Sequence, residues 1–194
     1  LGVDVAMQAL TKYPSGGADV LMGSVVTRDD DLHDALLMTH MRLGLGVGAN
    51  DAEAVLRGLP SLPLRYRAQD AATRELARWM QAQPRVARVL HPALPDSPGH
   101  AAWQRDARGA ACLFSVVFEP DVTPERVDAF CDALRLFRLG YSWAGPVSLC
   151  VPYDIPAMRA RPWPHAPRLV RFAVGLEDVE DLRADLAQAL RALT

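Results

Sequence analysis

The chain has 194 residues, of which half are hydrophobic and 23% are charged, and its formal net charge is −2. This composition is typical of a globular protein with a substantial core, and it excludes the strongly basic surface on which nucleic acids bind. No apolar run approaches the roughly 20 residues of a membrane span, and no signal-like segment opens the chain, so we expect a cytoplasmic protein. Three widely spaced cysteines favour buried, reduced thiols over disulfides or a zinc site.

The first part of the chain is predicted to hold two strands and two helices. Apolar and polar residues alternate over residues 2–8, and a run rich in β-branched residues lies within 19–27, so both segments are expected to be strands. A helix is expected from Asp29, where three aspartates suit the positive end of a helix dipole, and a shorter one over 51–59. The glycine run over 44–48 follows a helix rather than a strand, and we interpret it as a break between helices, not as a phosphate-binding loop.

Lys12 is the single lysine of the chain, because the other 20 of its 21 lysine and arginine residues are arginine. A guanidinium can replace an ammonium where charge is needed, but only a primary amine can form a Schiff base. Lys12 follows the first expected strand, at the end where open α/β sheets gather ligands, and residues 14–17 then force a turn. The hydroxyl of Thr11 could bind an anionic group or merely stabilise that turn. These residues alone leave a covalent catalyst and an ordinary surface lysine equally open.

The second part of the chain is predicted to begin with a long amphipathic helix over residues 61–83. We place the domain boundary near residues 57–60, which assigns 1–58 to a first domain and 59–194 to a second. The residues of the long helix that we expect to face inward are Leu64, Ala68, Ala72, Leu76, Trp79 and Met80.

Short strands and two further helices are expected after the long helix. Thr123 and Pro124 are a typical N-cap and first residue of a helix that should end near Leu134. Asp178 is expected to cap a last helix, whose apolar stripe includes Leu182 and Leu186. The expected strands cover residues 86–90, 111–118, 136–139, 147–151 and 169–174.

The histidines show no spacing typical of metal ligands, and we expect no metal site. We interpret all five as surface or core residues: His33, His40, His91, His100 and His165. Neither a nucleophile elbow nor a P-loop pattern is present.

One pattern of short motifs extends in order along nearly the whole chain. It begins with Gln8-Ala9-Leu10-Thr11-Lys12-Tyr13, with Gly16 and Asp19-Val20-Leu21-Met22-Gly23 after it. Its later parts lie at residues 57–59, 86–95, 99–100, 113–115, 136–137, 141–143 and 171–181. Together these motifs resemble the Cys/Met-metabolism family of pyridoxal-phosphate enzymes, which includes cystathionine β- and γ-lyases, cystathionine γ-synthase and methionine γ-lyase. Within that family, Tyr141-Ser142-Trp143 is most similar to the bacterial cystathionine β-lyase type.

The resemblance implies an α/β fold of the fold-type I PLP-dependent class. Residues 1–58 would be the end of the large cofactor-binding domain, and the rest a C-terminal α/β domain with a mainly antiparallel sheet covered by helices. Lys12 would hold pyridoxal 5′-phosphate as a Schiff base, Thr11 would contact its phosphate, and Ala9 would be a further cofactor-binding position. Because relatives carry further cofactor contacts in an N-terminal half, and because this chain opens at Leu1 in a strand-like pattern, we expect a C-terminal portion of a longer protein.

The resemblance also implies a substrate site. Arg171 would bind the substrate α-carboxylate with its planar fork, and Ser142 and Trp143 would line the site. Tyr141 and Ser142 would join Lys12 as catalytic residues.

The activity implied by the resemblance is a carbon–sulfur lyase reaction of methionine biosynthesis and transsulfuration. β-Elimination of cystathionine, or of a similar thioether, would give homocysteine or another thiol, pyruvate and ammonia. A γ-acting sister enzyme and a catalytically decayed homologue that serves as a binding subunit remain open as alternatives. The expected partners are a small sulfur amino acid and further copies of the chain in a homotetramer built from dimers, with no nucleic acid and no membrane.

Four positions depart from the usual family pattern. Gly17 stands where a histidine is common, and Pro14 is unusual in the lysine loop. Ala144 replaces the first of two glycines, and Val147 takes a place where glutamate is frequent. We expect these departures to affect substrate preference more than cofactor binding.

Overall fold

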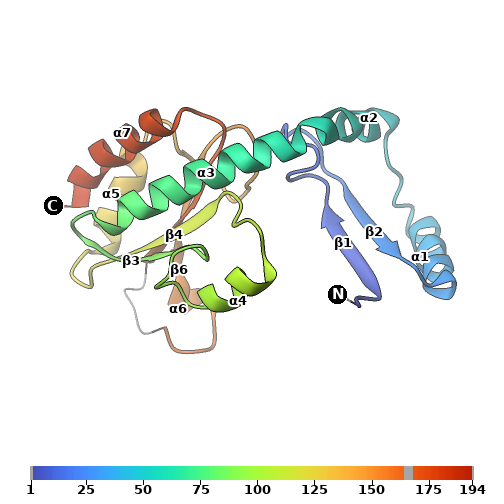
Figure 1. Cartoon of the computed structure of the whole chain (residues 1–194), viewed down its shortest axis with the longest axis horizontal. Coiled ribbons are helices and arrows are strands. Elements are labelled where there is room, and N and C mark those ends of the chain that lie inside the picture. The colour runs from blue at the N-terminus through green and yellow to red at the C-terminus, as the bar shows by residue number, and fades with distance from the viewer. Residues whose placement is uncertain (1, 164–167, 194) are drawn as a thin grey trace. The chain divides into compact units, whose positions relative to one another are not determined.

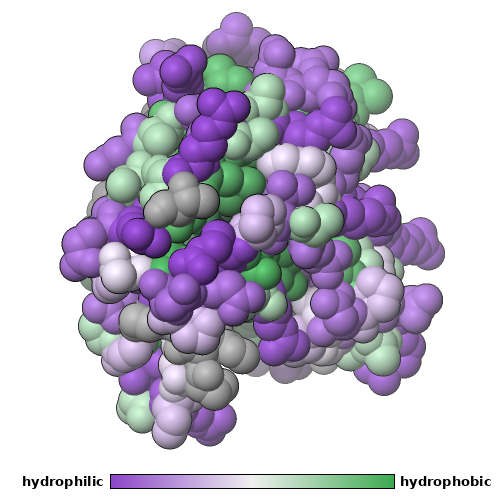
Figure 2. All heavy atoms as spheres, turned by 90° about the vertical axis from the view of Figure 1, so that its left-hand side faces the viewer, coloured by the Kyte–Doolittle hydropathy of each residue, from purple (hydrophilic) through white to green (hydrophobic). Residues whose placement is uncertain are grey.

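The computed structural model describes residues 2–163 and 168–193 and divides into two units, Leu1–Pro63 and Leu64–Thr194 (Figure 1). The division falls in the first turn of the long helix, a few residues after the domain boundary that we placed near 57–60. In the view from the side that bears the C-terminus, hydrophilic side chains cover most of the surface, with apolar ones between them (Figure 2). No helix among the described residues is long and apolar enough to cross a membrane.

The first unit contains a two-stranded antiparallel sheet and two helices. β1 (Val5–Ala9) pairs with β2 (Gly23–Thr27), and α1 (Asp30–Leu43), α2 (Ala49–Gly58) and the short 3₁₀ helix η1 (Leu59–Ser61) follow. The Asp29 carboxylate caps α1 by accepting a hydrogen bond from the Leu32 N–H at 2.8 Å, and Gly44 ends it in the left-handed conformation. The glycine run therefore breaks the helix as predicted. Both strands are shorter than expected, because residues before Val5 and before Gly23 do not pair.

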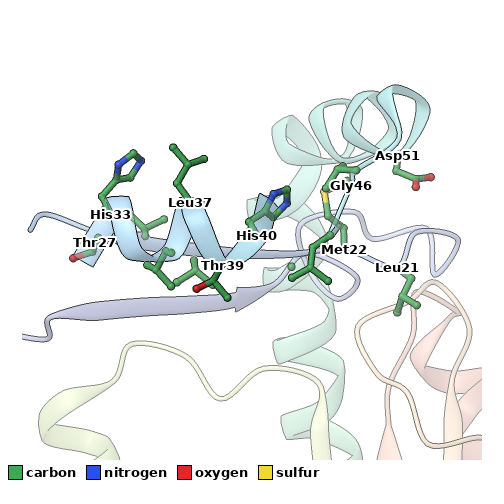
Figure 3. A pocket seen from close by; sticks show the side chains of 15 residues that line it. Leu21, Met22, Thr27, His33, Leu37, Thr39, His40, Gly46 and Asp51 are labelled. Atoms are coloured by element: carbon green, nitrogen blue, oxygen red, sulfur yellow. The ribbon is translucent and has the colours of Figure 1, made fainter. Parts of the chain in front are cut away.

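Most apolar side chains of the first unit lie on its surface. Val20 and Val55 are its only buried hydrophobic residues among those described, and neither β1 nor α1 contains a buried residue. Side chains from β2, α1 and the segment after α1 line a mainly apolar hollow of about 800 Å³ (Figure 3). This unit does not build a core of its own from the residues that the structure describes.

The second unit is a five-stranded mixed sheet packed against helices. Its strands, β3 (Val86–Leu90), β4 (Leu113–Phe118), β5 (Arg138–Leu139), β6 (Leu149–Asp154) and β7 (Arg168–Ala173), lie in the order β3-β4-β7-β6-β5. All neighbours are antiparallel except β5 and β6. The helices are α3 (Leu62–Gln81), α4 (His100–Asp106), α5 (Pro124–Ala133), α6 (Ile155–Met158) and α7 (Val179–Ala189), which continues as the 3₁₀ helix η2 (Leu190–Leu193).

Several helix predictions for this unit are confirmed. The Thr123 hydroxyl accepts the Arg126 N–H at the start of α5, and the Asp178 carboxylate accepts the Glu180 N–H at the start of α7. The short helices α4 and α6 were not predicted. The predicted inward face of α3 was wrong in part, because Leu64, at 67%, and Ala68 are exposed while Gln69 and Thr73 are buried.

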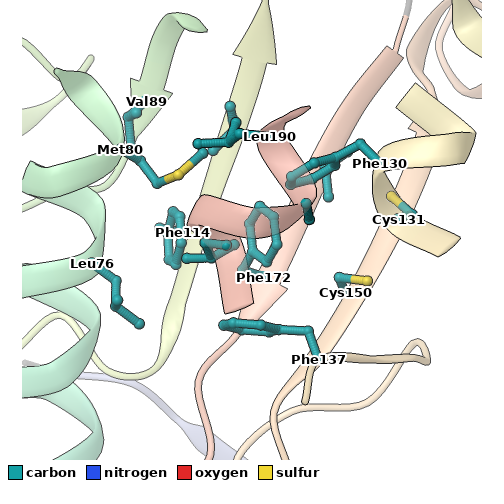
Figure 4. Close-up of a cluster of buried hydrophobic side chains, with 14 of the residues drawn as sticks. Leu76, Met80, Val89, Phe114, Phe130, Cys131, Phe137, Cys150, Phe172 and Leu190 are labelled. Carbon is teal, nitrogen blue, oxygen red and sulfur yellow. The ribbon is translucent and has the colours of Figure 1, made fainter. Parts of the chain in front are cut away.

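One face of the sheet forms the core with the helices. Phe114 on β4 stacks on Phe172 of β7 with ring centroids 4.9 Å apart, and Phe130 of α5 meets Phe172 edge-on (Figure 4). Leu76 and Met80 of α3 belong to the same buried cluster. The three cysteines are buried free thiols, as predicted: Cys112, Cys131 and Cys150.

The alternate residues of the central strands point to the opposite face of the sheet. The register places Arg171 of β7 between Ser115 of β4 and Val151 of β6. A small cluster around Val117 and Leu169 lies on this face, with Tyr153, Ile155 and Trp163 packed against it. The face that the core helices leave open therefore carries an arginine among apolar and aromatic side chains.

Candidate functional site

The loop that carries Lys12 is tightly folded at the end of β1. The Lys12 N–H donates to Ala9 O at 3.2 Å, and the Lys12 carbonyl accepts the Gly16 N–H at 3.0 Å. The Ser15 hydroxyl donates to Thr11 O at 3.1 Å, and residues 14–16 are buried. These bonds fix the backbone on both sides of a half-buried lysine.

Gly58, the last residue of α2, braces this loop. A Cβ on Gly58 would collide with the carbonyl oxygens of Pro14 and Ser15, which are backbone atoms and cannot rotate away. Only glycine allows α2 to approach the lysine loop this closely. This close approach explains the glycine in the motif at 57–59, which the sequence pattern alone did not explain.

Thr11 anchors the loop to the segment that precedes β2. Its hydroxyl accepts the Met22 N–H at 3.0 Å and donates to Met22 O at 3.2 Å. The bond to Met22 O occupies the hydroxyl proton, so donation from the Thr11 hydroxyl to a phosphate oxygen would require that bond to be exchanged. The phosphate contact of Thr11 stays a prediction, as does cofactor binding at Ala9, which is exposed and pairs with Gly23.

The chemistry of the lysine loop fits pyridoxal phosphate. The loop presents the only primary side-chain amine of the chain, and an amine is the group that an aldehyde cofactor needs for a Schiff base. The large hollow beside β2 has no such chemistry: its lining is mainly apolar and does not include Lys12. Among the described residues, no cluster of histidine, cysteine or acidic side chains could hold a metal ion, and His165 lies outside those residues.

In the second unit the structure brings Arg171 together with the segment 141–143. One terminal nitrogen of Arg171, Nη2, donates to Tyr141 O at 2.8 Å and to Ser142 O at 3.2 Å. The guanidinium carbon lies 5.6 Å from the ring centroids of both Trp143 and Tyr153. Aromatic rings near a guanidinium stabilise its charge and limit its motion, and the planar fork suits a carboxylate.

Tyr153 is a residue of this site that sequence reasoning missed. Its ring approaches both Arg171 and Tyr141, the latter with centroids 6.0 Å apart. Strand alternation places Tyr153 on the face of Arg171, because Tyr153 lies two residues after Val151, the cross-strand neighbour of Arg171. The predicted strand ended at 151, and Tyr153 was therefore never placed on a face.

The backbone after Trp143 explains one departure from the family pattern. Ala144 is buried and has φ of 65°, a left-handed conformation that glycine adopts without strain. Residue 144 therefore has the left-handed backbone conformation that suits the glycine of the family pattern, although its side chain is a methyl group. Farther along, the Glu177 carboxylate accepts bonds from the Ser148 N–H at 2.7 Å and the Ser148 hydroxyl at 2.8 Å.

Comparison with known proteins agrees with these features. Residues 1–191 match the family model described as Cys/Met metabolism PLP-dependent enzyme. Cystathionine β-lyase of Bordetella avium is 40% identical over 98% of this chain and 48% of its own length, and that of Escherichia coli strain K12 is 38% identical over 95% and 48%. A solved methionine γ-lyase of Micromonospora echinospora is 35% identical, with a TM-score of 0.85 over 97% of this chain and 50% of that one.

The chain thus spans about half the length of the curated relatives that it matches. Similarity to solved structures supports the predicted fold-type I class, with a mixed sheet and helices. The prediction of a pyridoxal-phosphate enzyme family from the lysine motif is confirmed. The chain belongs to the Cys/Met metabolism family of PLP-dependent enzymes.

Proposed function

We propose that the protein containing this chain is a carbon–sulfur lyase that cleaves cystathionine, or a similar thioether amino acid, by β-elimination. The products would be a thiol such as homocysteine, pyruvate and ammonia. The observation that carries the proposal is the single amine, Lys12, on a braced loop in a chain whose cystathionine β-lyase relatives are 38% and 40% identical. The cytoplasmic location and the homotetramer stay predictions from the resemblance.

The proposed mechanism assigns a different task to each part of the chain. Pyridoxal phosphate, when bound, supplies an electron sink for the bond electrons at the substrate Cα. Lys12 would bind the cofactor and then move the Cα proton as general base, because a primary amine can do both. Arg171 would hold the substrate carboxylate, and the rings of Trp143 and Tyr153 would shield that ion pair from water.

The first experiment removes the amine. In the full-length natural protein, Lys12→Ala should abolish both the visible absorbance of lysine-bound cofactor and the release of pyruvate from cystathionine. A matched control is the double variant Lys12→Ala/Arg67→Lys, which restores a lysine at an exposed position of α3 and should stay inactive. Cofactor absorbance retained in Lys12→Ala would contradict the assignment.

A γ-acting enzyme is the second candidate. The similarity to a methionine γ-lyase, at 35% identity and a TM-score of 0.85, favours it. The products of cystathionine separate the two: homocysteine and pyruvate indicate β-cleavage, and cysteine and 2-oxobutyrate indicate γ-cleavage. A protein that binds cofactor and cleaves no sulfur amino acid would contradict both.

A further inference from the structure

Gln69 of α3 is the residue with the most unusual environment in the second unit. Its side chain is 1% exposed, although it is polar and the pattern of apolar residues did not predict it to face inward; it lies seven residues before the buried Leu76, on the same face of the helix. A buried amide is costly unless its hydrogen-bonding groups find partners. The partners of Gln69 are therefore informative about its role.

Both protons of the Gln69 amide bind backbone carbonyls from two distant segments. Nε2 donates to Gly145 O at 3.0 Å and to Val174 O at 3.1 Å. The opposite placement of the amide would set Oε1 against two carbonyl oxygens, so the donor assignment is fixed by its surroundings. One side chain thus ties the loop after Trp143 to the residue three positions beyond Arg171.

The loop that Gln69 holds is the one that holds Arg171. The carbonyl oxygens of Tyr141 and Ser142 accept hydrogen bonds from Arg171 Nη2, at 2.8 and 3.2 Å. A second fastening lies at the far end of the loop, where the Leu176 N–H donates to Pro146 O at 2.8 Å. The segment 141–146 is therefore attached at both ends to β7 and its extension, and Gln69 supplies the only side-chain donor to Gly145 O among the described residues.

We propose that Gln69 is a positioning residue for substrate carboxylate binding: it fixes the 141–146 loop, and through the Tyr141 and Ser142 carbonyls it sets the orientation of the Arg171 guanidinium. The inference rests on the proposed function, because it assigns the carboxylate to Arg171. Gln69 touches no reacting group. Its loss should weaken substrate binding rather than the chemical step, because carboxylate binding depends on the direction of a planar fork.

The test uses Gln69→Met in the full-length, cofactor-loaded protein, because methionine keeps the length of the side chain and donates no hydrogen bond. The variant loses both hydrogen bonds of the amide, and only the one to Gly145 O holds the loop. We expect the KM for cystathionine to rise about tenfold while kcat stays within about twofold, since one lost hydrogen bond is worth about one factor of ten. Hydrogen–deuterium exchange should increase in peptides covering 141–146 and not in those covering β4. The matched control is Thr73→Val, one turn along α3, where the buried hydroxyl donates only to Gln69 O at 2.6 Å within the helix. This control should leave KM and loop exchange unchanged.

A second variant keeps the proposal testable if the first is too unstable to purify. Gln69→Glu preserves size and shape, but its ionised carboxylate would face two carbonyl oxygens, and the rise in KM and in loop exchange should exceed that of Gln69→Met. Unchanged loop exchange in these variants would overturn the proposal, as would an equal rise of KM in Thr73→Val. If the wild-type protein cleaves no sulfur amino acid, the proposed function fails, and the exchange comparison alone then decides whether Gln69 holds the loop.

Discussion

The stability of the second unit should fall as the pH drops below about 6.5, because of one buried histidine. His91 follows β3 and is 1% exposed. Its Nδ1 accepts the Ala93 N–H at 3.3 Å, so the ring proton is on Nε2, which is buried and has no partner among the described residues. The pKa of His91 is lowered from 6.5 to about 4, chiefly by burial and then by the charges of Arg74 and Arg78, against the opposing charge of Asp70.

The sign follows from where the proton binds. Between about pH 6.5 and pH 4, the unfolded chain binds a proton at His91 and the folded chain does not, so the free energy of unfolding decreases as the pH falls through this window. Near pH 5 the loss relative to pH 8 should be about 2 kcal/mol, and below pH 4 it should level off at about 3 kcal/mol, since one pKa unit is worth about 1.4 kcal/mol.

The assay is urea unfolding of wild type and His91→Gln at pH 8 and pH 5. Carboxylates contribute equally to both proteins, so the difference between their pH dependences isolates His91. The control His33→Gln changes an exposed histidine of the first unit and should keep the wild-type dependence. A His91→Gln variant that loses as much stability as wild type between pH 8 and pH 5 would refute the reasoning.

Two further predictions concern backbone geometry at the site. Ala144→Val should destabilise the protein by about 2 kcal/mol or more in thermal unfolding, because a β-branched residue is badly strained at φ of 65°, whereas Ala144→Gly should stay within about 1 kcal/mol of wild type. Gly58→Ala should cost about 1–3 kcal/mol and lower cofactor occupancy, because the new methyl group meets the carbonyls of Pro14 and Ser15. Gly48→Ala is its control, since a Cβ there comes no closer than 3.4 Å to the Asp51 side chain; equal losses in cofactor absorbance would contradict the bracing role of Gly58.

The parts of the fold that were predicted well are those with a long local signal. The last helix has a regular apolar stripe and an aspartate cap, and both are present in α7. The helices α4 and α6 were missed because they have only 7 and 4 residues, too few for a periodic pattern to emerge. The second strand was expected from residue 19 but begins at Gly23, because Met22 bonds to the lysine loop: its N–H donates to the Thr11 hydroxyl, and its carbonyl accepts both the N–H and the hydroxyl proton of Thr11.

The site divides in the same way between local and distant information. Lys12, Arg171 and residues 141–143 lie in contiguous motifs, so the resemblance to the family was enough to select them as candidates, and their roles stay predictions. Tyr153 and Gln69 act through contacts with segments far away in the chain, and Gln69 lies 76 residues from Gly145. On α3, Gln69 and Thr73 are buried although they are polar, and Leu64 is exposed although it is apolar. Apolar periodicity predicts this inward face wrongly because it treats every polar residue as exposed. A buried polar residue on an otherwise amphipathic helix is therefore a mark of tertiary hydrogen bonding, and here those hydrogen bonds lead to the loop that holds Arg171.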